Sequence, residues 1–203
     1  QCEKPMAIEL GEAEGNAEVC EGYKVILTFN HMRRFGAPFR KAKALLDAGA
    51  IGQLTRLEAF TSNLYDWGTH WFDMLFFYND ETPVDWVIGQ IDARGGRSIF
   101  GAMVEGQGLS MFNYANGVMG LVVTGAPGLY EQGEPLRSVG CGNRLIGTKG
   151  SLEVGVNGGP DLRIRNPDTH GRWEPVEVDG GVHGSDLHTL AILDLIAALK
   201  EGR

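Results

Sequence analysis

The sequence predicts a short α/β segment followed by an α+β domain, whose large open sheet is mostly antiparallel and carries helices on one face. Before residue 50, helical and strand-like apolar spacing alternate along the chain. Beyond residue 50, strand-like segments follow one another, with 30 glycines along the chain, about twice the usual share of roughly 7%. Glycines between such segments are typical of tight turns, which favour antiparallel pairing.

The first part of the chain is predicted to alternate helix, strand and helix. Residues 6–20 carry apolar side chains at steps of three and four, and Pro5 suits the first turn of such a helix, because its missing N–H costs nothing there. Residues 24–29, KVILTF, predict a buried strand, and residues 38–48 a second helix that ends at Gly49. A buried strand between helices is typical of a parallel sheet.

Most elements predicted beyond residue 50 are strands. They cover residues 54–62, 84–93, 109–114, 118–124, 151–156, 162–164 and 173–178. Between the third and fourth of them, Asn116-Gly117 is a strong hairpin signal.

Two helices are predicted among these strands. Residues 69–78 form a short apolar helix, with Thr69 in place to cap it. Residues 186–200 form the other, with Ser185 as its N-cap. Because the second helix is apolar on nearly every side, we expect it to be buried.

Composition and charge exclude several classes of protein. Hydrophobic residues make up 43% and charged residues 22%, which is typical of a globular protein that buries a core. A net charge of −8 disfavours nucleic-acid partners, and no apolar run is long enough for a membrane span. Cys2, Cys20 and Cys141 are scattered without a C-x-x-C spacing, so we expect a reducing, cytoplasmic location rather than disulfides or a zinc knuckle.

Three residues suggest proton chemistry before any family is considered. Lys4 precedes a proline and is therefore held in an extended conformation, although spacing alone explains it equally as a solvated lysine. Asp66 and His70 are four residues apart, and a carboxylate beside an imidazole fixes its tautomer and raises its basicity. The alternative is a turn-forming aspartate followed by a histidine in a first helical turn.

A metal site is the second chemical hypothesis. His70 and Asp73, and likewise His183 and Asp186, have the i, i+3 spacing of metal ligands, as in a divalent-metal sugar isomerase or hydrolase. No H-E-x-x-H or similar signature accompanies them, so we predict no metal. Asp186 is equally explained by the favourable interaction of a carboxylate with a helix N-terminus.

Four segments, in this order, resemble the glucose-fructose oxidoreductase / inositol dehydrogenase (Gfo/Idh/MocA) family. They are EKPMA at 3–7, FNHMRRFGAPFRKAKALLDAGAIGQL at 29–54, Asp66-x-x-x-His70 continuing as HWFD, and RLIGTKGSLEV at 144–154. No single segment is decisive, but their order and spacing extend the resemblance over essentially the whole chain. The resemblance implies an N-terminal Rossmann domain that binds NAD or NADP, and a C-terminal α/β domain whose open sheet walls the substrate site.

The same resemblance implies where this chain lies in such a protein. Residues 1–50 would be the C-terminal tail of the Rossmann domain, and residues 51–203 a C-terminal substrate and oligomerisation domain, incomplete at its end. No G-x-G-x-x-G occurs between a strand and a helix. We therefore expect a fragment that lacks on the order of 100 residues of a dinucleotide-binding domain, and a homo-oligomer formed through the C-terminal sheet.

The implied reaction is hydride transfer between a nicotinamide cofactor and a secondary alcohol of a sugar, polyol or inositol. Lys4 and His70 would handle the proton with Asp66, and which of the two is the base is left open. The residues implied beside the cofactor are Glu3, Lys4, Pro5, Asn30 and Arg34. Those implied beside the substrate are Trp67 and His183.

Two further alternatives remain within this resemblance. Some members of the superfamily use NAD to hydrolyse glycosides by transient oxidation. Alternatively, the chain by itself is a non-catalytic fragment that keeps only the substrate and oligomerisation domain.

Overall fold

The computed structural model describes residues 1–94, 96–125, 130–131, 134–135, 141–184 and 186–202. Its helices are α1 (Leu10–Gly22), the 3-10 turn η1 (Met32–Phe35), α2 (Ala37–Asp47), α3 (Trp67–Tyr78) and α4 (Leu187–Glu201). The main strands are β1 (Leu54–Thr61), β2 (Val84–Asp92), β5 (Gln107–Tyr114), β6 (Met119–Gly125), β9 (Cys141–Gly147), β10 (Ser151–Val156), β11 (Leu162–Arg165) and β12 (Glu174–Pro175). Two short pairs are β3 (Arg97–Ile99) with β4 (Ala102–Val104), and β7 (Tyr130–Glu131) with β8 (Glu134–Pro135).

The described residues contain one eight-stranded sheet in the order β12-β11-β10-β9-β1-β6-β5-β2. Every neighbouring pair is antiparallel except β1 with β6, so the sheet is mixed but mostly antiparallel, as predicted. The predicted hairpin joins β5 to β6, and Gly117 has a φ of 84°, which explains the glycine there. β1 and β6 can be parallel because α3, β2 and β5 lie between them along the chain.

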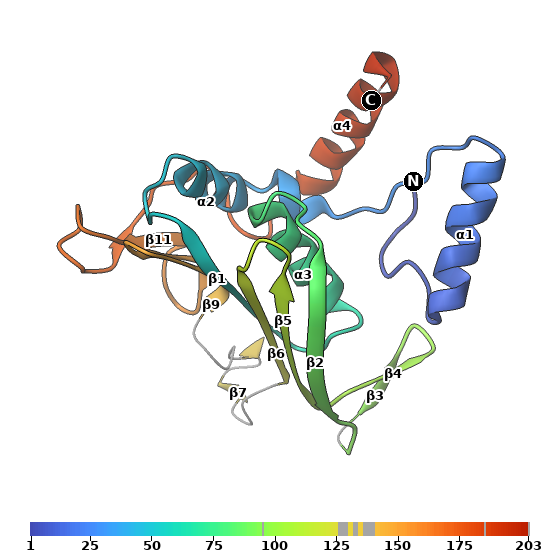
Figure 1. The fold of residues 1–203 in the computed structure, drawn as a ribbon, viewed down its shortest axis with the longest axis horizontal. Coiled ribbons are helices and arrows are strands. Elements are labelled where there is room, and N and C mark those ends of the chain that lie inside the picture. Colours follow the sequence, from blue (N-terminus) through green and yellow to red (C-terminus); the bar gives the residue numbers. More distant parts are fainter. Residues whose placement is uncertain (95, 126–129, 132–133, 136–140, 185, 203) are drawn as a thin grey trace.

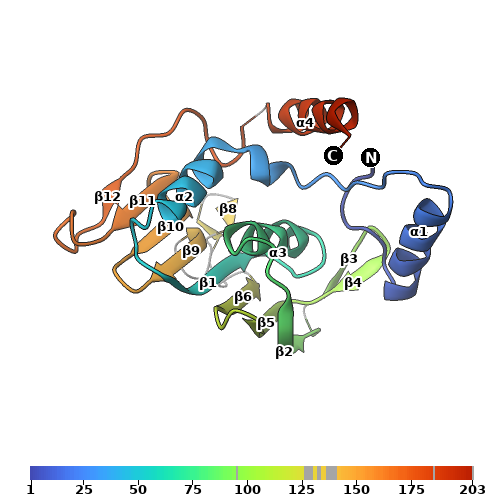
Figure 2. The same ribbon diagram turned by 45° about the horizontal axis from the view of Figure 1, so that its top comes forward.

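Helices α2 and α3 cover one face of this sheet, and the hydrophobic core lies between these helices and the sheet (Figures 1 and 2). From the helices come Phe39, Ala42, Leu46, Trp71, Met74, Leu75 and Tyr78. From the strands come Leu57, Ala59, Phe112, Tyr114, Val122, Leu145, Leu152, Val154 and Leu162. Alternate residues of each strand therefore point to one face, as the predicted alternation requires.

Helix α3 begins earlier than predicted. Its N-cap is Asp66 instead of Thr69, whose hydroxyl donates to the Asp66 carbonyl oxygen at 2.8 Å. The Asn63 side chain accepts a hydrogen bond from the Asp66 N–H at 2.6 Å, and the Asn63 carbonyl oxygen one from the Gly68 N–H at 2.8 Å. This asparagine turn starts the helix two residues early and thereby fixes Asp66 at its entrance.

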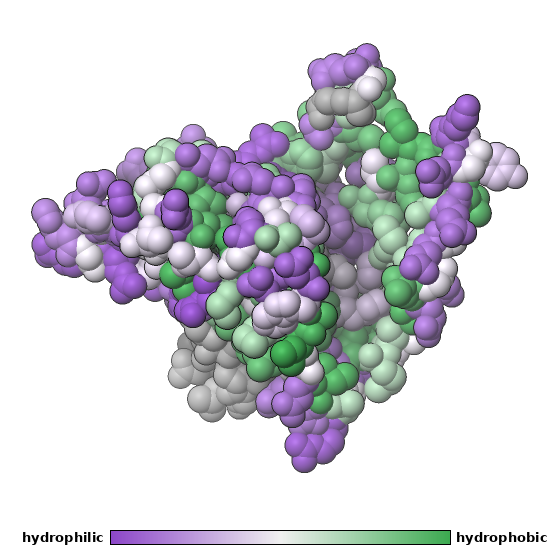
Figure 3. Space-filling model, in the orientation of Figure 1, coloured by the Kyte–Doolittle hydropathy of each residue, from purple (hydrophilic) through white to green (hydrophobic). Residues whose placement is uncertain are grey.

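The prediction that the C-terminal helix is buried is wrong. Only Leu187 and Ala191 of α4 are buried, whereas Leu193 is 56% exposed and Leu199 54%. In the described part of the chain α4 packs mainly against η1, and Figure 3 shows its hydrophobic surface in the open. The apolar composition of α4 indicates that its surface favours burial, but composition does not identify the partner that would bury it. The predicted cap Ser185 lies outside the described residues.

The first thirty residues also differ from the prediction. Helix α1 starts at Leu10 instead of near Pro5, and none of its residues is buried. The strand predicted at residues 24–29 is reduced to one parallel bridge between Cys2 and Phe29. A strand needs neighbours that satisfy its backbone, and the described chain supplies only this one. The interpretation of residues 1–50 as a Rossmann remnant therefore stays a prediction.

No helix in the described ranges has the length and apolar content that crossing a bilayer requires.

Candidate functional site

The site lies where residues 3–5, residues 30–34, the start of α3 and residues 182–183 come together. Lys4 and Pro5 are joined by a cis peptide bond. Asp66 is placed by the cap of α3, and His70 follows one turn later on the inner side of that helix. Asp66 and His70 are neighbours in the sequence, whereas Lys4 is 62 residues from Asp66, and the structure brings all three together.

Lys4 and Asp66 form an ion pair. The Lys4 Nζ donates to the Asp66 carboxylate, and also to the Asp66 carbonyl oxygen at 3.1 Å. Both side chains are 15% exposed, so the pair is largely shielded from water and screened less than a surface pair. The described partner of Asp66 is therefore the lysine, whereas its spacing had suggested His70.

His70 is a buried, neutral imidazole. It is 5% exposed, and its Nδ1 atom has no hydrogen-bond partner in the described part of the chain. Burial, together with smaller effects of the positive charges of Lys4 and Arg33, lowers the pKa of His70 to about 3. The ring is therefore uncharged at neutral pH and can accept a proton or a hydrogen bond.

Aromatic and cationic side chains surround His70. Trp67 meets it edge-on with ring centroids 6.3 Å apart, and His31 does so at 6.1 Å. On its other side Trp67 contacts His183 at 6.2 Å. The two residues predicted to bind substrate, Trp67 and His183, are thus adjacent to each other, and Trp67 is also adjacent to His70.

Arg33 is the residue that sequence reasoning missed. It is 2% exposed, although arginine is seldom fully buried. The available signal was the Arg33-Arg34 doublet, because a 3-10 turn points adjacent residues in different directions.

Glu3 and Asn30, both predicted beside the cofactor, are also in contact. The Asn30 amide donates to Glu3 Oε1 at 2.8 Å and lies 3.0 Å from the Nδ1 of His188. The Asn30 Oδ1 atom is buried and has no partner among the described residues. This buried amide oxygen thus has an unused acceptor capacity among the described residues.

Arg34 lies in a separate ion-pair cluster. It donates to both oxygens of Asp73, at 2.8 and 2.7 Å, and to Glu81 at 2.7 Å. Burial opposes its charge, but the hydrogen bonds that Arg34 donates to Asp73 and Glu81 outweigh this and raise the pKa of Arg34 above its ordinary value. A role for Arg34 toward the cofactor stays a prediction.

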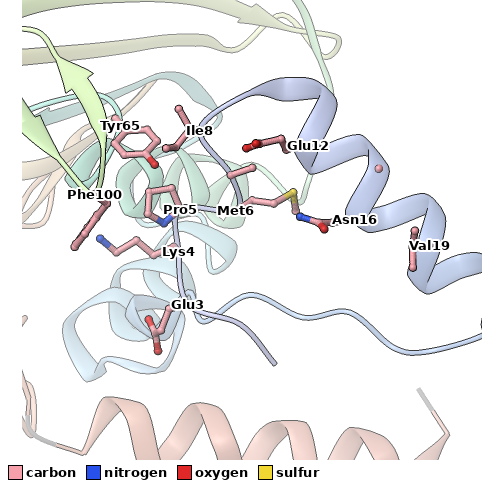
Figure 4. A pocket seen from close by; sticks show the side chains of 12 residues that line it. Glu3, Lys4, Pro5, Met6, Ile8, Glu12, Asn16, Val19, Tyr65 and Phe100 are labelled. Carbon is pink, nitrogen blue, oxygen red and sulfur yellow. The ribbon is translucent and has the colours of Figure 1, made fainter.

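An open cavity of about 1060 Å³ adjoins the Lys4–Asp66 pair. Figure 4 shows Glu3, Lys4 and Pro5 on one side of it and helix α1 on the other. Tyr65, the neighbour of Asp66, and Phe100 of the β3–β4 turn also line it. A cavity of this size admits a small ligand beside Lys4.

The described residues contain no group of three or more histidine, cysteine, aspartate or glutamate side chains that could hold a metal ion. Asp73, from the first of the two ligand-like spacings, instead pairs with Arg34, and its carboxylate lies 3.8 Å from His31.

The mixed sheet is similar to that of Gfo/Idh/MocA-type oxidoreductases. The chain is 25% identical over 178 residues to the rhizopine catabolism protein MocA of Rhizobium meliloti, across 79% of this chain and 52% of that protein. It therefore spans about half the length of this curated relative. No family model matches the chain.

Solved structures show the same fold. An oxidoreductase from Agrobacterium radiobacter, in complex with NAD+, L-tartaric acid and magnesium, matches 99% of this chain and 63% of its own, with a TM-score of 0.71 and 19% identity. UDP-N-acetylglucosamine 3-dehydrogenase from Acidithiobacillus ferrooxidans matches 99% and 61%, with a TM-score of 0.68 and 18% identity. The resemblance predicted from the four segments is confirmed.

Proposed function

We propose that this chain is part of an NAD(P)-dependent oxidoreductase, which transfers hydride between the nicotinamide and a secondary alcohol of a sugar, polyol or inositol. The observation that carries the proposal is the Lys4–Asp66 ion pair beside the buried, neutral His70. Oxidising an alcohol requires removal of its hydroxyl proton as hydride leaves the carbon, and these side chains can bind the oxygen and accept the proton. The names of the similar proteins support an oxidoreductase.

His70 is the better candidate for the base. Its Nδ1 is without a partner among the described residues and can offer a lone pair to the hydroxyl proton, whereas an ammonium group has none. The Lys4 ammonium is paired with Asp66, so it donates hydrogen bonds and would stabilise negative charge on the reacting oxygen. Asp66 holds Lys4 in place.

The residues proposed to hold the nicotinamide half of the cofactor fit that task. Glu3, Lys4 and Pro5 border the large cavity, and the unpartnered Asn30 Oδ1 offers a buried acceptor near Glu3. When bound, the nicotinamide accepts the hydride. The choice between NAD and NADP is part of the test below.

The domain assignment, location and assembly complete the proposal. Residues 1–50 would end a Rossmann domain, residues 51–203 would form the substrate domain, and the protein would be cytoplasmic. We propose a homo-oligomer formed through the sheet. Strand β2 supports it, because β2 is the sheet's edge and its Val87, Ile88 and Ile91 are 60–64% exposed.

The test is alcohol oxidation by the protein that contains this chain, with NAD and NADP and a panel of inositols, polyols and sugars, read as formation of reduced nicotinamide. We expect His70→Asn to lower kcat/KM by about 100-fold to 10,000-fold. The matched control is His170→Asn, an exposed histidine outside the site with φ 52°, a conformation that asparagine tolerates. Absence of turnover with every alcohol would overturn the proposal, and sugar release without reduced nicotinamide would favour the glycosidase.

A further inference from the structure

Arg33 is buried among the groups that surround the proposed substrate. Its guanidinium donates to the Val182 carbonyl oxygen and lies 3.1 Å from the Nδ1 of His183. The guanidinium carbon is 5.4 Å from the ring centroids of both Trp67 and Trp71. One side chain of η1 thus connects the loop at residues 182–183 to two aromatic residues of α3.

The contact with Arg33 determines the tautomer of His183. Arginine has five N–H donors and no acceptor, so the Nδ1 atom of His183 must accept the hydrogen bond. The ring proton of the neutral imidazole is therefore on Nε2. Since Trp67 contacts both His183 and His70, the position of Arg33 also sets how these two histidines lie relative to each other.

Arg33 and Arg34 have different environments although they are consecutive. Arg34 is 30% exposed at its side chain and pairs with two carboxylates, as expected of a stabilising surface arginine. Arg33 is 2% exposed, and its contacts include a carbonyl, an imidazole and two indole rings. Burial of a charge against groups of a binding site is more often a feature of function than of stability.

We infer that Arg33 is a positioning residue, which fixes His183 as the Nε2–H tautomer and holds it against Trp67 beside His70. His183 then presents an N–H donor to an oxygen of a polyhydroxylated substrate other than the reacting one. The substrate part of this inference rests on the proposed function. The tautomer and the packing are properties of the chain alone.

Two substitutions separate charge from geometry. Arg33→Lys keeps the charge but loses the planar fork and the stacking, whereas Arg33→Met loses both at similar length. Arg40→Met is the matched control, because Arg40 also donates to a carbonyl oxygen, that of Arg34, and lies 5.2 Å from the ring of Phe35, but is exposed and outside the site. Circular dichroism and Tm establish which variants fold.

The first readout is the imidazole ¹⁵N spectrum of this chain at pH 8. We expect an unprotonated Nδ1 on His183 in the unmodified chain and in Arg40→Met, and a mixture of tautomers in Arg33→Lys and Arg33→Met. If Arg33→Met does not fold, Arg33→Lys decides. A His183 proton on Nδ1 in the unmodified chain, or an unchanged spectrum in the folded Arg33 variants, overturns the inference.

The second readout uses the protein that contains this chain and its best alcohol. Arg33→Lys should lower kcat/KM by about 10-fold to 100-fold, mostly through KM, because a substrate contact is misplaced. In a His183→Ala background the same substitution should have little further effect. Equal losses in both backgrounds would overturn the inference. If no alcohol is oxidised, the proposed function fails, and the ¹⁵N spectrum still decides the role assigned to Arg33.

Discussion

At the scale of single residues, the site depends on one unusual histidine. His70 is neutral because it is buried and because Lys4 and Arg33 place positive charge nearby. An imidazole in ordinary surroundings titrates near pH 6.5 and would be partly charged at neutral pH. Its neutral form is the one that can accept a proton from a substrate hydroxyl.

Removing the Lys4 charge should raise the pKa of His70. After the dominant effect of burial, Lys4 is the largest charge that lowers it. In Lys4→Met we therefore expect the His70 ring to titrate measurably above pH 3, followed by NMR. Lys41→Met, an exposed lysine of α2, is the control and should change nothing. An unchanged His70 titration in Lys4→Met would show that burial alone keeps the ring neutral.

Stability should fall as the pH is lowered through the window between the two pKa values of His70. The unfolded chain binds this proton near pH 6.5 and the folded chain only near pH 3, so protons favour unfolding between these values. The His70 contribution to the free energy of unfolding approaches a loss of about 1.4 kcal/mol per pH unit in this window. Urea unfolding at pH 4 to 7 measures it, and His70→Asn should flatten the dependence whereas His170→Asn should not. Equal slopes in the two variants would contradict the pKa of His70.

Sequence alone could reach part of this site. The i, i+4 spacing of Asp66 and His70 places both at the start of one helix. Lys4 is 62 residues from Asp66, so only resemblance to a known family linked them, and not local physics. Arg33 was missed because burial of an arginine depends on which distant groups pack around it. Distant packing also explains why Asp66 pairs with Lys4, and not with the imidazole that its spacing suggested.

At the scale of elements, a charged ladder crosses the sheet. Glu58, Arg144, Glu153 and Arg163 lie directly opposite one another on β1, β9, β10 and β11. Arg144 donates to Glu153 at 2.7 Å and to Glu58 at 3.0 Å. Both glutamates are nearly buried, at 5% and 3% exposed. Their charges therefore need the arginine between them.

Arg144→Met should destabilise the fold, because it leaves two buried carboxylates without this shared partner. Breaking a buried pair costs about 3–5 kcal/mol, and the one-quarter exposure of Arg144 places the expected loss at or below the lower end. Arg56→Met is the control: Arg56 also contacts Glu58 but is 48% exposed, so its loss should be under about 1 kcal/mol. Chemical denaturation of both variants gives the comparison, and similar losses would contradict a special role for Arg144.

Element prediction succeeded where a pattern was local. The alternation of apolar and polar residues predicted β1, β2, β5, β6, β10 and β11, and the Asn-Gly pair predicted the β5–β6 turn. Strand β9 was missed because Arg144 interrupts its apolar run, and this charge is satisfied only by neighbouring strands. The strand predicted at 24–29 failed for the converse reason, since its apolar run has no neighbours among the described residues.

At the scale of the whole molecule, much apolar surface is uncovered. Strand β2 and helix α4 both expose large aliphatic side chains, among them Ile88 at 63% and Ile192 at 49%. Surfaces of this kind are typical of interfaces with other proteins or domains. The sequence predicted an assembly through the sheet without saying which strand takes part, and it predicted α4 to be inside.

If the sheet mediates the proposed oligomer, a charge on β2 should abolish it. Ile88→Lys places a charge on the exposed edge strand, and light scattering coupled to size exclusion should then give the monomer mass. Ile192→Lys, on α4, is the matched control and should leave the oligomer intact. A monomer in the unmodified protein, or dissociation by Ile192→Lys instead, would contradict the sheet as the interface.

We propose that Lys4, Asp66 and His70 serve hydride transfer from a secondary alcohol. Deuterium labelling of the alcohol follows that hydride itself. A substrate found in the alcohol panel, deuterated at the carbinol carbon, is incubated with the oxidised cofactor and the protein that contains this chain. Mass spectrometry of the reduced nicotinamide should then show the deuterium, at a rate that His70→Asn lowers and His170→Asn does not. Deuterium that stays on the substrate or passes to water, with none in the nicotinamide, would contradict the account.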